Sequence, residues 1–401
     1  MNTIKTKYIF DIFSGATPKS SILSFWDGNI VWVTPADYKS EDKYINDSEK
    51  HITEDGYNSC ATNLVPKGSI VVAKRAPIGT VAIANLPLCT NQGCLSCVPH
   101  KNINSTFYYY VLFAWNQHMD KLGQGTTFME IPFKVFRNMK VPLYPVQQQQ
   151  QIVAYLDAKC DAIDRAIAHK RSVIEKLKEY RTAVITKAVT KGLNPDVKMK
   201  DSGVKWFTTI PSHWLVKRLK FVFDNFDYQR KPVDASNRSQ KGHILYDYYG
   251  ASGVIDKIDD YTCEGRKMLI GEDGANLVLR NLPLIYIADG KYWVNNHAHI
   301  INTKAGYDFY YFAYQLEAID YAEFITGMAQ PKLSQKNLNK VSLIVPPYDE
   351  QKQISIYLDA KCSKIDSAIQ QQEQAIAKLE EYRKSIIYYA VTGKIDCGKA
   401  V

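Results

Sequence analysis

The amino-acid sequence predicts an α/β protein in which two globular domains, related by pseudo-two-fold symmetry, are joined by two long antiparallel coiled-coil helices. Three observations predict this: a long segment occurs twice, both copies have coiled-coil spacing, and each follows a domain-sized block of short strand-forming runs. A chain of 401 residues has room for two such domains. The predicted segments are a first domain at 1–146, a helix and linker at 147–200, a second domain at 201–345 and a C-terminal helix at 346–401.

The repeat is the strongest single feature of the sequence. Ile152–Thr190 recurs as Ile354–Thr392, and in both copies YLDAKC is followed in the same register by KL, one further residue and EYR. A long internal repeat indicates a duplicated architecture. The chain therefore alternates domain, helix, domain, helix.

Apolar residues recur in both copies at alternating steps of four and three, which is the period of a coiled coil. Polar residues interrupt this seam at matching steps, at Lys170 with Gln372 and at Arg181 with Arg383. Such interruptions fix register and partner. A dimerisation coiled coil needs only one copy per chain, so the duplication favours packing of the two helices on each other. The seam consists of Leu156, Cys160, Ile163, Ile167, Ile174 and Leu177, and of Leu358, Cys362, Ile365, Ile369, Ile376 and Leu379.

Composition indicates a globular protein. The apolar fraction is 46%, yet no apolar run approaches the ~20 residues that span a bilayer. The N-terminus, MNTIKTKYIF, lacks the apolar core of a signal peptide, so we expect a cytoplasmic protein with no membrane partner. The net charge of +9 is concentrated in the first half, mostly on the first helix, and permits nucleic-acid binding through phosphate contacts without requiring it.

Four residues raise the question of a metal site: Cys89, Cys94, Cys97 and His100 in CTNQGCLSCVPH. A Cys-x-x-Cys pair suits zinc, but a structural zinc site usually has a second pair, which this chain lacks. We therefore expect reduced thiols packed in a strand-rich core and no metal.

The two domains share a plan and differ in detail. GSIVVAKRAPIGTVAIAN corresponds to GRKMLIGEDGANLVLRN, and TNQGCLSC corresponds to VNNHAHII. The aromatic runs FYYYVLFAW and FYYFAYQL also match at an offset of 202 residues. This pattern is typical of two related domains that bind different targets.

The tandem YLDAKC and EYR helices resemble the two conserved regions of a type I restriction-modification specificity subunit. IPSHWLVKRLKFVF, VNNHAHIIN and GMAQPKLSQKNLNKVSLIVPP are similar to that family's target-recognition domains. The first domain departs from the pattern, since it begins with MNTIKTKYIFDIFSG and lacks an IPSHW-type lead.

The resemblance implies a function. Each domain would read one half of a split, asymmetric site in double-stranded DNA, and the helices would set the spacer. Two modification subunits would dock on the helices and methylate adenine N6 with S-adenosylmethionine. Restriction subunits would supply the ATP- and Mg-dependent nuclease. The chain itself would carry no cofactor and no catalytic residue.

Reading bases requires side-chain donors and acceptors, such as Arg for guanine and Asn or Gln for adenine. His297 and His299 alternate along a strand, so we expect packed or hydrogen-bonded histidines rather than metal ligands. The candidate DNA-binding residues lie near the predicted turns: Lys74, Arg75, Asn91, Gln92, Thr126 and Thr127, then Asn276, Arg280, Asn295, Asn296, Gln330 and Lys332.

Two other functions remain open from the sequence. The first is an adenine methyltransferase acting alone, whose catalytic turn needs Asn, Asp or Ser before Pro-Pro-aromatic. Here Val345 precedes Pro346-Pro347-Tyr348, and Tyr144-Pro145 stands at the equivalent place, which indicates a repeated helix lead-in. The second is a coiled-coil scaffold that binds only protein, which the Asn-, Gln- and Arg-rich turns disfavour. No G-x-x-x-x-G-K-[ST] loop for ATP is present.

Overall fold

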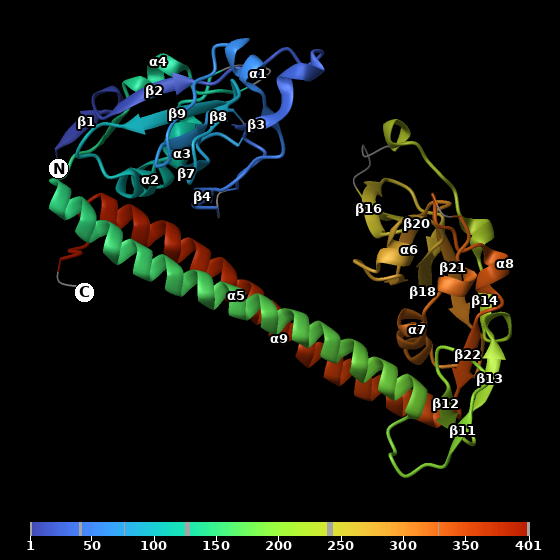
Figure 1. Ribbon diagram of the computed structural model, residues 1–401. Coiled ribbons are helices and arrows are strands. Elements are labelled where there is room, and N and C mark those ends of the chain that lie inside the picture. Colours follow the sequence, from blue (N-terminus) through green and yellow to red (C-terminus); the bar gives the residue numbers. More distant parts are fainter. Residues whose placement is uncertain are drawn as a thin grey trace. The chain divides into compact units, whose positions relative to one another are not determined.

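The computed structural model describes residues 2–39, 42–75, 77–124, 129–238, 244–327 and 329–398 (Figure 1). The chain forms two compact units, one made of residues 1–170 and 373–401 and the other of residues 171–372. Each unit combines sheets and short helices with one half of each long helix, which confirms the predicted α/β class and the two long helices.

The first unit is built around a five-stranded sheet. Its neighbours pair antiparallel except for β4 and β7, which are parallel. The strands, in sheet order, are β2 (Phe10–Ser14), β9 (Cys94–Pro99), β6 (Ile70–Ala73), β7 (Val81–Ala84) and β4 (Tyr44–Ile45). β6 and β7 are buried along their whole length, as expected from their continuous β-branched and Ala composition.

The described part of this unit also contains a smaller sheet, a separate strand pair and four short α-helices. The sheet contains β5 (His51–Ile52), β3 (Trp26–Val33) and β8 (Cys89–Thr90), and β1 (Thr3–Lys5) pairs with β10 (Lys140–Pro142). The helices are α1 (Glu54–Asn58), α2 (Ser105–Ala114), α3 (Asn116–Lys121) and α4 (Phe133–Arg137).

The second unit repeats the plan. One four-stranded sheet has the order β14 (Phe223–Asn225), β21 (Ala298–Thr303), β18 (Lys267–Gly271), β19 (Ile285–Ala288). The other has β16 (Gly253–Ile258), β15 (Tyr246–Gly250), β20 (Lys291–Val294), β17 (Cys263–Glu264). β11 (Met199–Asp201) pairs with β12 (Thr209–Pro211), and β13 (Leu215–Arg218) with β22 (Ser342–Val345). Its short helices are α6 (Asn276–Leu279), α7 (Phe309–Ala318) and α8 (Gln335–Leu338).

The strand pairings show how the units correspond. β2-β9-β6-β7 matches β14-β21-β18-β19, and the parallel pair β3/β8 matches β15/β20. Ala73 pairs with Cys94 in the first unit, and Gly271 pairs with Ala298 in the second. These pairs define equivalent ends of the two sheets.

The two long helices are α5 (Val146–Lys191) and α9 (Tyr348–Val391), each uninterrupted. The first unit takes the start of α5 and the end of α9, and the second unit takes the end of α5 and the start of α9. The helices therefore run antiparallel in each unit, as Figure 1 shows for the green and red ribbons. The seam residues of α5 and α9 are all buried or half-buried.

An ion pair links the two helices in each unit. Arg383 Nη1 lies 3.0 Å from Asp164 Oδ1 in the first unit, and Arg181 Nε lies 3.0 Å from Asp366 Oδ1 in the second. Each arginine interrupts the apolar seam of its own helix, and its carboxylate partner is on the other helix. In coiled coils, a polar residue in the seam fixes the register of the two helices. Each arginine has this role here, because its ion pair forms only when the carboxylate on the other helix lies beside it.

A buried glutamine in the first turn of each long helix connects that helix to its domain. Gln149 is 1% exposed; its Oε1 accepts the N–H of Asn104 at 3.1 Å and its Nε2 donates to Tyr144 O at 2.8 Å. Gln351 is equally buried and makes the matching bonds to Asp308 N–H and Pro346 O, both at 2.8 Å. Asn104 and Asp308 are the N-caps of α2 and α7, so one side chain fixes the position of two helix starts.

Tyrosines make a second connection. Tyr110 on α2 donates to Asp157 Oδ1 on α5 at 2.6 Å, and Tyr314 on α7 donates to Asp359 Oδ1 on α9 at 2.7 Å. These tyrosines, like the two N-caps, correspond at an offset of 204 residues. The offset of 202 predicted for the aromatic runs is therefore wrong by two residues. Both runs contain several consecutive aromatic residues, so the sequences also match well when one run is shifted by two positions.

Substituting Gln149→Leu should destabilise the first domain by about 1–3 kcal/mol, because two buried backbone groups lose their partner. The neighbouring, exposed Gln150→Leu should change stability by less than about 0.5 kcal/mol. Native-state hydrogen exchange of the α2 amides measures both. Equal effects of the two substitutions would contradict the connecting role of Gln149.

Candidate nucleic-acid interface

In the first unit, four predicted residues meet where β6 ends and β9 begins. Lys74 follows β6, and its N–H donates to Gly93 O at 2.9 Å, which places the Asn91–Gly93 turn beside it. Arg75 pairs by backbone with Glu130, and its Nε lies 2.8 Å from Glu130 Oε2. We call Lys74, Arg75, Asn91, Gln92 and Glu130 the first edge.

The side chains of the first edge differ in how exposed they are and in which hydrogen bonds they already make. The Lys74 side chain is mostly buried, whereas the Arg75 side chain is 45% exposed despite its ion pair. Asn91 Oδ1 accepts the N–H of Gly93 at 2.8 Å, so this amide shapes its own turn. Gln92 is exposed and hydrogen-bonds Thr17. Arg75 and Gln92 therefore offer the outward-facing donors. Thr126 and Thr127 lie outside the described residues.

The second unit has the equivalent arrangement after β18. Glu272 N–H donates to His297 O at 2.8 Å, and Asp273 pairs by backbone with Lys332. Lys332 Nζ lies 3.2 Å from Glu272 Oε1. We call Glu272, Asp273, Asn295, Asn296 and Lys332 the second edge.

The backbone bridge is the same at both edges, but its charges are inverted. In the first unit the strand end carries the cations Lys74 and Arg75 and the crossing segment carries Glu130. In the second unit the strand end carries Glu272 and Asp273 and the crossing segment carries Lys332. One fold thus presents opposite donor and acceptor patterns at the same place.

Three of the second unit's candidates face solvent there: Asn296, Gln330 and Lys332, the last with a side chain that is 53% exposed. Asn295 is buried, and its Oδ1 accepts the N–H of His297 at 2.8 Å.

Asn276 and Arg280 lie on and directly after α6, and their side chains bond within the chain. Asn276 bonds to Leu282 and Pro283, and Arg280, at φ 55°, bonds to Glu317 O. Their polar groups hold the connection between β18 and β19.

Sequence reasoning missed a charged cluster behind the second edge. His299 is 0% exposed, and its Nδ1 lies 2.7 Å from Asp227 Oδ2. Arg230 pairs with Glu272 and lies 3.4 Å from Asp227 Oδ2. His299 is hydrogen-bonded, as expected, but its partner Asp227 is distant in sequence. No local pattern indicated that pairing.

The carboxylates of this cluster are stabilised in the ionised form. Burial by itself raises the pKa of the Asp227 carboxyl, but the hydrogen bond and charge of His299, the Ile300 N–H and Arg230 outweigh it, and the pKa lies below its ordinary value. The pKa of Glu272 is lowered in the same way, against its burial, by Arg230, His299 and Lys332.

The three cysteines considered as zinc ligands are buried in three different parts of the core. Cys89, Cys94 and Cys97 belong to separate hydrophobic clusters. Burial raises the pKa of the Cys89 thiol to about 11 and that of Cys94 to about 12, and also raises that of Cys97. His100 Nε2 instead lies 3.1 Å from Asp11 Oδ1. Among the described residues, no group of three His, Cys, Asp or Glu side chains is placed to hold a metal ion.

The Pro-Pro-Tyr turn begins α9. Pro346 O accepts from Gln351 Nε2, and Pro347 O accepts from the Gln351 N–H at 3.0 Å. At the start of α5, Gln149 makes the same bonds to Tyr144 O and Pro145 O. These carbonyls before each helix already accept hydrogen bonds from the helix's own first turn, which supports a lead-in rather than a base-binding turn.

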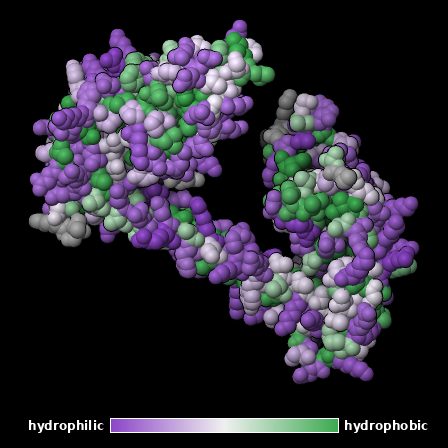
Figure 2. Space-filling view, viewed as in Figure 1, coloured by the Kyte–Doolittle hydropathy of each residue, from purple (hydrophilic) through white to green (hydrophobic). Residues whose placement is uncertain are grey.

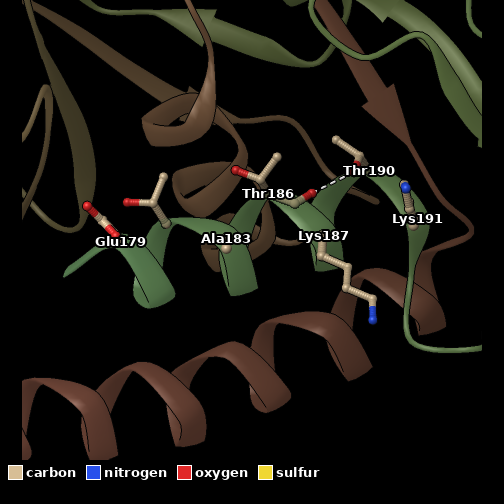
Figure 3. Close-up of a pocket in the computed structure, with 7 residues that line it drawn as sticks. Glu179, Ala183, Thr186, Lys187, Thr190 and Lys191 are labelled. Atoms are coloured by element: carbon tan, nitrogen blue, oxygen red, sulfur yellow. Dashed lines mark hydrogen bonds between the residues drawn. The ribbon is translucent and has the colours of Figure 1, made fainter. Parts of the chain in front are cut away.

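The outer face of α5 forms an open depression of about 620 Å³ (Figure 3). Its lining comes from this one helix and includes Glu179, Ala183, Thr186, Lys187 and Lys191. Thr190 Oγ1 donates back to Thr186 O at 2.6 Å, as the dashed line in Figure 3 shows. This is an open helix surface and not an enclosed cavity.

Hydrophilic residues predominate on the face shown in Figure 2, with apolar patches between them. Within the part of the chain that the structure describes, no helix combines the length and apolar character needed to cross a bilayer.

The fold and the two edges define a protein of two tandem domains, which share one backbone plan and carry different side chains at the same place. The sequence profile of the type I restriction modification DNA specificity domain matches residues 1–177 and again residues 211–381. The chain belongs to this family.

Relatives of known name agree. The chain is 26% identical over 369 residues to the type I restriction enzyme MjaIX specificity subunit of Methanocaldococcus jannaschii, covering 86% of this chain and 82% of the relative. It is 21% identical over 375 residues to the EcoprrI specificity subunit of Escherichia coli, covering 88% and 85%.

Solved structures share the fold. A chain from work on complex assembly and conformational transition of the type I R-M system aligns with a TM-score of 0.73 at 14% identity, over 97% of both chains. The HsdS subunit from Thermoanaerobacter tengcongensis aligns with a TM-score of 0.51 at 14% identity, over 98% of this chain and 97% of the other.

The lowered pKa of Asp227 predicts an acid-sensitive second domain. Because the folded-state pKa lies below the unfolded one, the carboxylate's stabilisation is complete above about pH 4 and is lost as the pH falls through the folded value. Asp227→Asn should cost about 1–3 kcal/mol near neutrality and make the loss of stability on acidification shallower.

Urea unfolding between neutral and acidic pH measures this effect. The exposed Asp196→Asn serves as the control and should shift stability by less than about 0.5 kcal/mol. If the free energy of unfolding fell equally steeply with pH in wild type and in Asp227→Asn, Asp227 would not be the source of the acid sensitivity.

Proposed function

We propose that this chain is the DNA specificity subunit of a type I restriction-modification complex, and that each domain reads one half of a split, asymmetric site in double-stranded DNA. The observation that carries the proposal is the pair of equivalent edges with inverted charge. Two copies of one reader with the same surface would recognise identical half-sites, whereas these edges present different donors and acceptors to DNA.

The residue types at the edges suit base recognition. Arg75, which keeps 45% of its side chain exposed, has the donor fork that pairs with guanine O6 and N7. Gln92 and Asn296 are exposed amides of the kind that pair with adenine. Lys332 and the basic excess of the first half would supply phosphate contacts.

The chain recognises DNA and leaves the chemistry to partners. Two modification subunits dock on the long helices and transfer a methyl group from S-adenosylmethionine to adenine N6, and restriction subunits hydrolyse ATP with Mg²⁺ during cleavage. Family membership supports these partners, and the outer face of α5 is an open surface of the kind a partner covers.

The first test is motif-resolved mapping of N6-methyladenine in a host that expresses this chain with its modification subunit. We expect a split motif with a fixed gap that disappears when the chain is deleted. Exchanging residues 1–146 for the equivalent domain of a relative should change one half of the motif and leave the other half unchanged. A short continuous motif, methylated without a partner subunit, would refute the non-catalytic role.

The gap should depend on helix length. Seven residues added to α5 after Lys170, with seven added to α9 after Gln372, keep the heptad phase and lengthen the pair by ~10 Å. The mapped gap should grow by up to about three base pairs, at ~3.4 Å per pair, while both half-sites stay the same.

The control places the same seven residues in the linker between α5 and β11, at residues 193–198, where the gap should not change. An unchanged gap in the helix variant would show that the helices do not set the spacing.

A further inference from the structure

The first domain has a short turn at the end of its main sheet that lies opposite the first edge. This 3₁₀ turn, Thr6–Tyr8, comes directly before β2, and Phe10 of β2 pairs with Pro99, the last residue of β9. The first edge lies where β9 begins. The N–H of Thr6 donates to Met139 O at 3.0 Å, which places the turn beside the end of α4.

Cations and an exposed aromatic ring make up the surface of this turn. Lys7 lines a hollow of about 340 Å³ together with Lys134 and Arg137 of α4. Tyr8 is 60% exposed, and Lys7 Nζ lies 5.1 Å from the centre of its ring. None of the three cations forms an ion pair with another residue that the structure describes. We call Lys7, Tyr8, Lys134 and Arg137 the first basic face.

The second domain repeats the backbone arrangement. The 3₁₀ turn Leu219–Phe221 comes directly before β14, at the end of the sheet opposite the second edge. The N–H of Leu219 donates to Val341 O at 2.8 Å, and Val341 follows α8 as Met139 follows α4. The two turns therefore occupy equivalent places in their domains.

The side chains of the second turn have the same chemistry as those of the first. Phe221 is 56% exposed, and Lys220 Nζ lies 4.9 Å from the centre of its ring. Lys336 on α8 and Lys340 just after it are exposed as well. Within the described ranges, these three lysines have no carboxylate in ion-pair contact. We call Lys220, Phe221, Lys336 and Lys340 the second basic face.

Carboxylates next to the two turns do not cancel this charge, because each has its own basic neighbour. Asp11 Oδ1 on β2 lies 3.1 Å from His100 Nε2, and Asp224 Oδ1 on β14 lies 3.8 Å from Lys304 Nζ. The two edges carry opposite charges at equivalent places, whereas the two basic faces carry the same charge. A surface that stays the same in domains with different edges suits a ligand that both domains share.

The position and chemistry of the basic faces indicate which ligand this is. They lie at the sheet ends away from the edges that would read bases. Cations beside an exposed aromatic ring suit an acidic protein surface. In the proposed complex, two modification subunits serve the two half-sites, so one copy lies beside each domain.

We infer that each basic face docks an acidic surface of one modification subunit, so that one chain holds two copies of the same partner in the same way. The inference rests on the proposed function, because it names the surface that binds the partner of that function. It adds to the long helices a second contact for each copy, on the recognition domain itself.

The test measures how fast the modification subunit associates with the immobilised full chain, without DNA and at several salt concentrations. Biolayer interferometry records the association of the two copies, and native mass spectrometry counts the copies that are bound. Complementary charges speed association at low salt, and this effect is lost as salt screens them.

Two charge-reversed variants address the two faces separately. Lys7→Glu with Arg137→Glu reverses the first basic face, and Lys220→Glu with Lys336→Glu reverses the second. Each pair should slow the association of one copy roughly tenfold or more at low salt and leave the other copy unchanged. The difference should disappear near ~1 M salt, where charges are screened within ~3 Å. At limiting concentration, each variant should hold one copy where wild type holds two.

A matched control tests whether net charge alone explains the effect. Lys19→Glu with Lys50→Glu makes the same change of charge at exposed sites outside the first basic face and should keep both rates within about twofold of wild type. Lys7→Gln with Arg137→Gln removes the charge without reversing it and should slow one copy by a smaller factor. This milder pair decides the question should the charge-reversed variant fail to fold.

The outcomes are distinguishable. If the basic-face variants and the control associate with the modification subunit at equal rates, the inference is overturned alone. It is also overturned if the basic-face variants bind that subunit normally but lose affinity for DNA of random sequence, since the faces would then contact the DNA backbone. If wild type binds no modification subunit, the partner of the proposed function and this inference are overturned together.

Discussion

Burial of the ends of α5 and α9 inside the domain cores is the constraint on which the rest of this protein depends. In the first unit, Ile152 and Leu156 of α5 share a cluster with Ile387 and Val391 of α9 and with the aromatic residues of α2. Neither core is complete without both helices. A change in helix register would therefore disturb the domain itself, and not only the connection.

Buried polar contacts give these apolar junctions a unique geometry. Apolar packing alone does not fix the direction of a contact. Gln149 and Gln351 each bond to the backbone N–H of an N-cap residue and to a carbonyl just before the long helix. All of these buried groups are paired only when the long helix sits in this one position. Tyr110 and Tyr314 add a second fixed point on each helix. The duplication preserved these contacts although the domains around them diverged.

The two edges keep the same backbone bridges although their side-chain charges differ. The bridge at Arg75 and Glu130 and the bridge at Asp273 and Lys332 use main-chain bonds, so their charges can invert without altering the fold. In the second domain the inverted charges come with a buried partner set, Asp227, Arg230 and His299, which has no counterpart at Leu95. The second edge thus rests on buried charged side chains, whereas the equivalent position behind the first edge holds the apolar Leu95.

Local pattern determined much of this protein. The repeat and the seam spacing predicted the long helices, and the predicted turn at Lys74 and Arg75 follows directly after β6, because helix period and turn chemistry are properties of neighbouring residues. Tertiary structure decided the rest: that Tyr314 meets Asp359 and so corresponds to Tyr110 at an offset of 204, that Arg280 bonds to Glu317 O, and that His299 meets Asp227. Those contacts join residues far apart in the chain. Their formation depends on how the sheets and helices pack, which no local spacing encodes.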